Sequence, residues 1–74
     1  MDYDSFLDTA WTDHATDAAA VAERISSQAL AFITEESRVI PVAHLAHHVF
    51  GEHLGRWADG LAFLGQVAAL PLTQ

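Results

Sequence analysis

Histidine is the residue type with which this sequence could bind a metal or catalyse a reaction. Five histidines occur among the 74 residues, and four of them lie between His44 and His53. On a helix, spacings of three and four residues place His44, His47 and His48 on one side, with Glu52 beside them. Imidazole nitrogens at those spacings can reach one cation, such as zinc or another divalent transition metal. One hypothesis is therefore a metal-binding helical bundle that uses His44, His47 and His48.

The cluster lacks the remaining parts of known metal motifs. Leu45 follows His44 at the position where an HExxH motif needs its glutamate. His44 and Glu52 lie about 12 Å apart along a helix axis, which is too far for both to share one ion comfortably. Two other interpretations stay open, namely a polar stripe that faces solvent and a stripe that packs against a partner chain.

The two remaining histidines have simpler interpretations. His53 lies in the apolar sector of its helix, between Phe50 and Trp57, so we expect a core histidine hydrogen-bonded to a carbonyl or an acid. His14 ends the first predicted helix, where the negative end of the helix dipole favours it. No serine stands in a nucleophile-elbow context, so we identify no catalytic residue and expect no enzyme.

The charge of the sequence and its lack of cysteine limit which partners and cofactors the chain can bind. The formal net charge is -7, with ten acidic residues, three arginines and no lysine. Phosphate backbones and anionic lipids repel such a chain, so we expect neither nucleic acid nor membrane as a partner. The absence of cysteine excludes disulfides and thiolate ligands. We therefore expect no cofactor, apart from the metal of the histidine hypothesis.

The N-terminus and the apolar runs bear on localisation. Met1-Asp2-Tyr3-Asp4 is acidic where a secretory signal needs positive charge, and no apolar run approaches the length of a membrane span. We expect a cytoplasmic protein. The lack of lysine and the abundance of alanine are typical of a GC-rich bacterial genome.

Helical periodicity extends over most of the chain and predicts four helices. The first spans about 4–14 and is capped by Asp4 or Ser5. The second follows a cap at Thr16-Asp17 and runs to Ile33. The third begins near Pro41 and runs to Leu54, with Gly55 as its C-cap, and the fourth runs from Trp57 until Pro71 stops it. Short connections favour two antiparallel helical hairpins in one all-α domain over residues 1–74.

The segment Leu54–Pro71 resembles the turn and second helix of a tetratricopeptide repeat. The residues that carry the resemblance are Gly55, Trp57, Gly60, Leu64 and Pro71. The resemblance implies a repeat-like hairpin from Leu30 to Pro71 that serves as a protein-interaction scaffold. A single repeat needs neighbours to cover its faces, and either a second copy or a chain that continues past Gln74 would supply them.

Three glycines fall inside the predicted third and fourth helices, where each costs about 1 kcal/mol relative to alanine. These are Gly51, Gly60 and Gly65. Such a cost is usually offset by the close approach of another backbone. We expect Gly60 and Gly65 to be packing contacts between the third and fourth helices.

The apolar content, 51% of a short chain, predicts an associating surface. Leu61, Leu64, Val67 and Ala68 form the main apolar stripe of the fourth helix. Phe63 lies off this stripe, and we expect it to form an exposed patch with Leu70 and Leu72. Trp57 completes the candidate interaction residues. The sequence thus predicts a protein-protein interaction module, either a homodimer or the first part of a longer helical-repeat protein.

Overall fold

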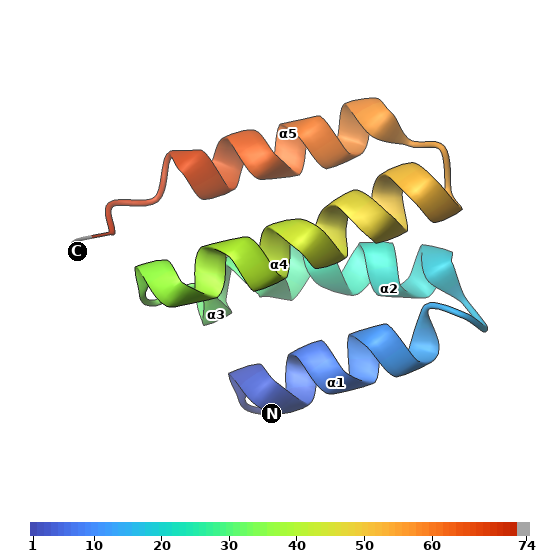
Figure 1. Cartoon of the computed structure of the whole chain (residues 1–74), viewed down its shortest axis with the longest axis horizontal. Helices are drawn as coiled ribbons and strands as arrows, with labels where there is room; N and C mark the ends of the chain where they lie inside the picture. Colours follow the sequence, from blue (N-terminus) through green and yellow to red (C-terminus); the bar gives the residue numbers. More distant parts are fainter. Residues whose placement is uncertain (73–74) are drawn as a thin grey trace.

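The fold consists of four helices joined by short connections, and the computed structural model describes residues 1–72 (Figure 1). The first helix is α1 (Tyr3–Asp13). The second comprises α2 (Ala18–Arg24), the π-helical η1 (Ile25–Ala29) and the short α3 (Leu30–Phe32). The third comprises a 3-10 turn, η2 (Glu36–Arg38), then α4 (Val39–Ala46) and the π-helical η3 (His47–His53), and the fourth is α5 (Trp57–Ala68). No strand occurs within residues 1–72, so the predicted all-α class is confirmed. The expected continuation past Gln74 lies outside the described residues.

The third helix lies in the middle of the fold. Its α4 part contacts α1 and α5, and its η3 part contacts α2 and α5. Successive helices run in opposite directions along the long axis of the molecule, as two antiparallel hairpins require (Figure 1). Across residues 1–72, every helix is too short or too polar to cross a bilayer. The α4–η3 helix is thus the surface on which both the first and the fourth helices pack.

An aspartate outside the predicted helix caps α1. The backbone N–H of Ser5 donates to Oδ1 of Asp2 at 2.8 Å, and the helix begins at Tyr3. The predicted cap at Asp4 or Ser5 is therefore wrong. This hydrogen bond lowers the pKa of the Asp2 carboxyl below its usual range, because the donated N–H stabilises the ionised form.

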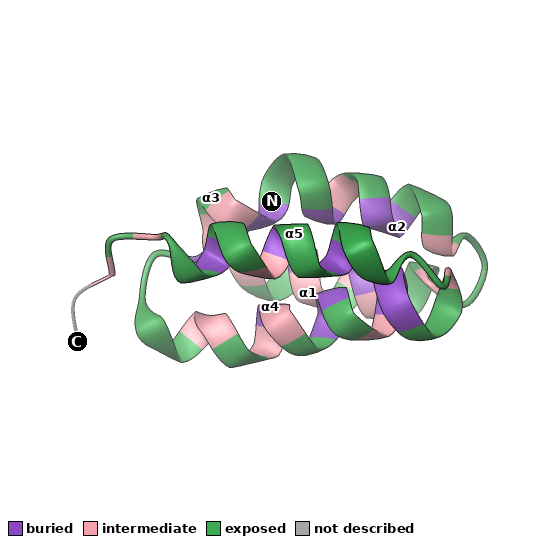
Figure 2. Cartoon of the chain, turned by 90° about the horizontal axis from the view of Figure 1, so that it is seen from above, coloured by how far each residue is buried: buried purple, intermediate pink, exposed green. Residues whose placement is uncertain are grey.

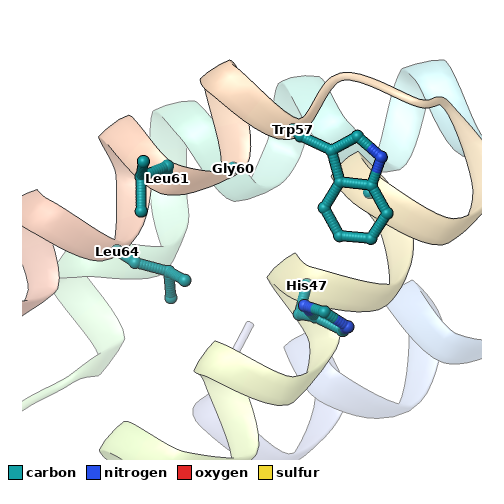
Figure 3. Close-up of a pocket in the computed structure, with 6 residues that line it drawn as sticks. His47, Trp57, Gly60, Leu61 and Leu64 are labelled. Atoms are coloured by element: carbon teal, nitrogen blue, oxygen red, sulfur yellow. The ribbon is translucent and has the colours of Figure 1, made fainter.

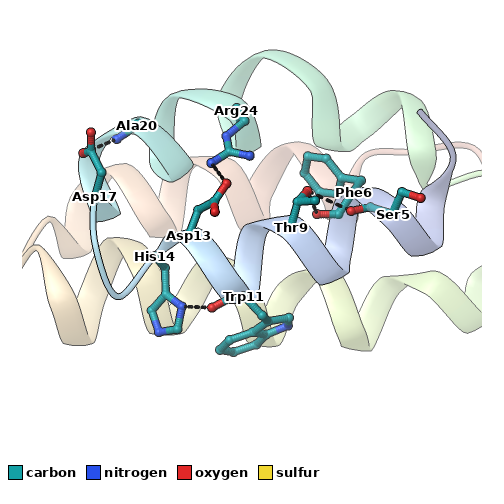
Figure 4. A network of polar contacts seen from close by, with 9 residues as sticks. All are labelled: Ser5, Phe6, Thr9, Trp11, Asp13, His14, Asp17, Ala20 and Arg24. Atoms are coloured by element: carbon teal, nitrogen blue, oxygen red, sulfur yellow. Dashed lines mark hydrogen bonds and ion pairs between the residues drawn. The ribbon is translucent and has the colours of Figure 1, made fainter.

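Polar contacts hold the helix ends on either side of the connection between α1 and α2 (Figure 4). The N–H of Ala20 donates to Oδ1 of Asp17 at 3.0 Å, which confirms the predicted cap of the second helix. One turn further along α2, the Arg24 guanidinium donates to the Asp13 carboxylate at 2.9 Å. The two helices are thus joined at the point where the chain reverses.

The third helix begins two residues before the proline that was expected to start it. Its α-helical part starts at Val39 and follows the η2 turn directly, so Pro41 is the third helical residue. Pro41 is tolerated there because the first N–H groups of a helix have no carbonyl partner within it. The predicted C-cap is confirmed, since Gly55 has a φ of 64° and the N–H of Arg56 donates to the Phe50 carbonyl at 2.7 Å.

The helices bury one continuous apolar core between them. Figure 2 shows the buried residues on the helix faces that point toward the centre. The core residues are Phe6, Ala10, Val21, Ala22, Ile25, Ala29, Ile33, Val42, Leu45, Ala46, Val49, Phe50, Phe63 and Val67. The solvent-accessible surface is 4443 Å², and a compact monomer of 8.0 kDa exposes about 4450 Å². Most of the high apolar content is therefore covered within the chain itself.

The expected apolar patch on the fourth helix is not exposed. Phe63 is only 3% exposed and belongs to the core, and Leu70 and Leu72 are half-buried against it. The exposed leucine of this helix is instead Leu61, at 72%. The predicted exposed patch of Phe63, Leu70 and Leu72 is therefore wrong.

The close approach of Gly60 to η3 accounts for which side of α5 faces the core. A Cβ placed on Gly60 would lie 3.0 Å from the Cβ of Phe50, so a side chain at this position would push Phe50 away by a few tenths of an ångström. With Gly60 turned inward, Phe63 follows it one turn later onto the same buried face, and Leu61 points outward. Gly60 is thus the expected packing contact. Gly65 is not one, because within residues 1–72 no atom of a neighbouring element lies within 4 Å of the position that a Cβ on Gly65 would take.

Candidate functional site

Three histidines from two helices converge at one end of the molecule. They are His14, His48 and His53, and one ring nitrogen of each lies within 4.8 Å of the others. Ring centroids are 4.9 Å apart for His14 and His48, 4.7 Å for His14 and His53, and 4.6 Å for His48 and His53. We call these three residues the histidine cluster.

The predicted set of His44, His47 and His48 does not come together. His44 contacts the Trp11 ring, with centroids 5.3 Å apart, whereas His47 contacts the Trp57 ring at the same centroid distance. Of the three, only His48 belongs to the histidine cluster. The three histidines of the metal hypothesis therefore do not converge on one point in the structure.

The π-helical geometry of η3 explains why His53 joins His48. A π-helix closes hydrogen bonds between residues five apart, so residues i and i+5 lie close together on one side. An α-helical rotation would have separated these two side chains and placed His53 among the apolar residues. The prediction of a core histidine is wrong, because His53 is exposed.

His14 reaches the cluster from the C-terminal end of α1, where it is the C-cap residue. Its Nδ1 contacts the carbonyl oxygen of Trp11, one of the last carbonyls of the helix (Figure 4). The expected position at the helix end is thus confirmed, and the carbonyl contact orients the imidazole ring. The Trp11 indole also lies 5.4 Å from the His14 ring and 5.3 Å from the His48 ring, between centroids, and forms an apolar wall of the cluster.

The contacts that surround the cluster are polar and partly acidic. Nδ1 of His48 lies 3.3 Å from Oε1 of Glu52, and Nε2 of His48 lies 3.1 Å from Nε2 of His14. The same carboxylate oxygen of Glu52 is 3.7 Å from Nε2 of His47. Among the described residues, no buried side-chain nitrogen or oxygen lacks a hydrogen-bond partner. The arrangement can therefore hold a positive charge, either a proton or a metal ion, between imidazole nitrogens.

A second candidate site is an apolar groove on the other side of η3, between η3 and α5 (Figure 3). It has a volume of about 270 Å³, and we call it the α5 groove. Its lining residues are His47, Gly51, Trp57, Gly60, Leu61 and Leu64. The Trp57 indole lies against the backbone of Gly51 and is 56% exposed. Large apolar surface is therefore open to solvent beside the groove.

One of the four predicted interaction residues lines the α5 groove. Trp57 lines it, whereas Phe63, Leu70 and Leu72 do not. Sequence reasoning missed Leu61, which it assigned to the buried stripe, and it gave Gly51 no partner. The signal that was available is Gly51 itself, since a glycine inside a helix indicates that another group occupies the space of its side chain.

The η3 segment contributes to both candidate sites. His48 and His53 lie on the side of η3 that meets the end of α1, and His47 and Gly51 lie on the side that meets α5. The resemblance of Leu54–Pro71 to a tetratricopeptide repeat stays a prediction. Comparison with protein-family models, with curated proteins and with solved structures finds no match for this chain.

Proposed function

We propose that this chain is a protein-association module that pairs with a second copy of itself through the α5 groove. One observation carries the proposal. Trp57 and Leu61 are two large apolar side chains, 56% and 72% exposed, that lie one turn apart on α5 and line the same apolar groove. Clustered exposed apolar surface of this kind usually marks an interaction site.

The distribution of charge favours a second copy as the occupant. Nine of the ten acidic residues precede Trp57, so α5 itself carries little of the net negative charge that makes two copies repel each other. The exception is Asp59, whose carboxylate accepts a hydrogen bond from the Arg56 guanidinium at 2.7 Å. Two copies can therefore bring their α5 helices together with little repulsion between acidic side chains of these helices.

The spacing of the groove residues suits helix-in-groove recognition. Trp57, Leu61 and Leu64 follow one another at intervals of four and three residues, which places them along one side of α5. In a two-fold symmetric pair, this side of one copy lies in the groove of the other, and the same contacts are made twice. A standard interface covers about 800 Å² of each partner, and a smaller one on this chain supports a dissociation constant on the order of micromolar.

Sedimentation equilibrium over a concentration series tests the proposal. The wild-type chain is expected to form dimers, and Leu61→Glu is expected to stay monomeric, because a carboxylate cannot enter an apolar interface unpaired. Ile40→Glu is the matched control, since Ile40 is 75% exposed on α4 and does not line the groove. A wild-type monomer at high micromolar concentration, or equal loss of dimer in both variants, would refute self-association.

A further inference from the structure

We propose that His14, His48 and His53 form a binding site for one divalent transition-metal ion of the zinc type. The proposal is independent of self-association, because the histidine cluster lies on the side of η3 that meets α1, away from the α5 groove. The proposal rests on how the ring nitrogens of His14 and His48 are placed relative to each other and to their hydrogen-bond partners.

The tautomers of His14 and His48 follow from what their Nδ1 nitrogens contact. Nδ1 of His14 contacts the carbonyl oxygen of Trp11, and a carbonyl oxygen can only accept, so this nitrogen carries a proton. Nδ1 of His48 lies 3.3 Å from the Glu52 carboxylate, which also accepts. In the neutral rings, the remaining nitrogen of each, Nε2, therefore bears a lone pair.

These two lone pairs face each other at 3.1 Å. Two acceptors at that distance need a cation between them, which is either one shared proton or a metal ion. Tetrahedral zinc with nitrogen ligands at 2.0–2.1 Å holds two of them about 3.3 Å apart. The spacing of His14 and His48 thus matches two ligands of one ion after a shift of a few tenths of an ångström.

His53 is placed to be the third ligand. A ring nitrogen of His53 lies within 4.8 Å of those of His14 and His48. Since His53 is exposed, its ring can turn toward the ion without displacing core side chains. The fourth coordination position faces solvent on this side and would take a water molecule.

The surroundings of the ligands also fit a metal site. Histidines that bind metals usually donate their other ring N–H to a carboxylate or a backbone carbonyl, as His48 does to Glu52 and His14 does to Trp11. Three imidazoles without a thiolate or a carboxylate ligand suit zinc, copper, nickel or cobalt, whereas magnesium and calcium prefer oxygen ligands. The class of ligand is therefore a borderline divalent transition metal.

Isothermal titration calorimetry with Zn²⁺ on the metal-free chain tests the assignment. We expect one ion per chain with a dissociation constant on the order of 1 μM or lower. His14→Ala, His48→Ala and His53→Ala should each weaken binding at least about tenfold, because each removes one ligand. His44→Ala is the matched control, since this neighbouring histidine lies outside the cluster and does not contact Glu52, and it should bind as the wild type does.

Two further measurements keep the result interpretable. Circular dichroism of each variant reports folding, and His53→Ala remains decisive even if a change at His14 or His48 unfolds the chain, because His53 is exposed. Binding should also weaken as the pH falls from about 7.5 to about 5.5, since protons compete for the same nitrogens. A wild type that releases no more heat than a chain carrying His14→Ala, His48→Ala and His53→Ala together would overturn the proposal. An equal loss in His44→Ala would do so too, as would one ion per two chains that depends on His53 alone.

Discussion

The Trp57 indole occupies the space where a side chain at position 51 would begin, since a Cβ on Gly51 would lie 2.2 Å from Cζ3 of the ring. The indole can rest on η3 only because this residue has no side chain. One wall of the α5 groove therefore depends on a single glycine in the middle of a helix.

Gly51→Ala should displace the Trp57 ring without unfolding the chain. The ring is 56% exposed and can swing into solvent, and the lost contact is partly offset by the helix propensity of alanine, about 1 kcal/mol above glycine. Tryptophan emission in a Trp11→Phe background should shift to longer wavelength, and dimerisation should weaken. An unchanged emission maximum would show that the indole does not rest on Gly51.

Gly65→Ala is the counterpart that should stabilise the protein. Gly65 lies inside α5, and the space around its absent side chain is open to 4 Å. Alanine there gains helix propensity without a clash, so the free energy of unfolding should rise by up to about 1 kcal/mol. For a domain of this size that corresponds to a Tm increase of roughly 4–8 °C in calorimetry. A lower Tm would mean that Gly65 packs closely against another group in solution.

Glu52→Ala should weaken zinc binding about 10- to 100-fold while the stoichiometry stays at one ion per chain. The carboxylate orients the His48 ring through Nδ1 and is not a ligand itself. Asp4→Ala removes an equal charge from the first turn of α1 and is the control for a general electrostatic effect. Calorimetry that finds the same loss in both variants would assign the effect of Glu52 to net charge.

Acid should weaken the N-terminal cap of α1. The lowered pKa of Asp2 means that the carboxylate binds a proton less readily in the folded chain than in the unfolded one. The stabilisation from this cap is complete above the usual carboxyl pKa and is lost as the pH falls through the lowered value. In Asp2→Asn the amide oxygen accepts from Ser5 at every pH.

Thermal melts of the wild type and of Asp2→Asn, followed by circular dichroism, measure this effect between about pH 5 and pH 2. As the pH falls, the Tm of the wild type should decrease relative to the Tm of Asp2→Asn. Because both share the other acidic residues, their titration cancels in the comparison. A difference that stays constant over this range would contradict the assigned role of Asp2.

The four helices could be predicted because their signals are local. Apolar periodicity, the Asp17 cap and the Gly55 C-cap each depend on neighbouring residues and are confirmed. The histidine cluster could not be predicted in this way. It requires His14 to approach η3 from a distant part of the chain, and it requires a π-helical segment that brings His48 and His53 together.

The exposed face of α5 shows a similar limit. Spacing alone identified an amphipathic helix, but the rotation of that helix depends on how closely Gly60 approaches Phe50. That tertiary contact buries Phe63 and exposes Leu61, the reverse of the expected assignment. The exposure of Trp57 depends less on this rotation, because Trp57 begins the helix next to the connection that Gly55 forms.

The most direct test of self-association is an isotope-filtered nuclear Overhauser experiment on a mixture of labelled and unlabelled chains, since it detects only contacts between copies. We predict intermolecular contacts between the methyl groups of Leu61 and Leu64 in one copy and the Trp57 ring in the other. Contacts confined to other surfaces, such as Ile40 on α4, or no intermolecular contacts in a sample at high micromolar concentration, would contradict the proposed role of the α5 groove.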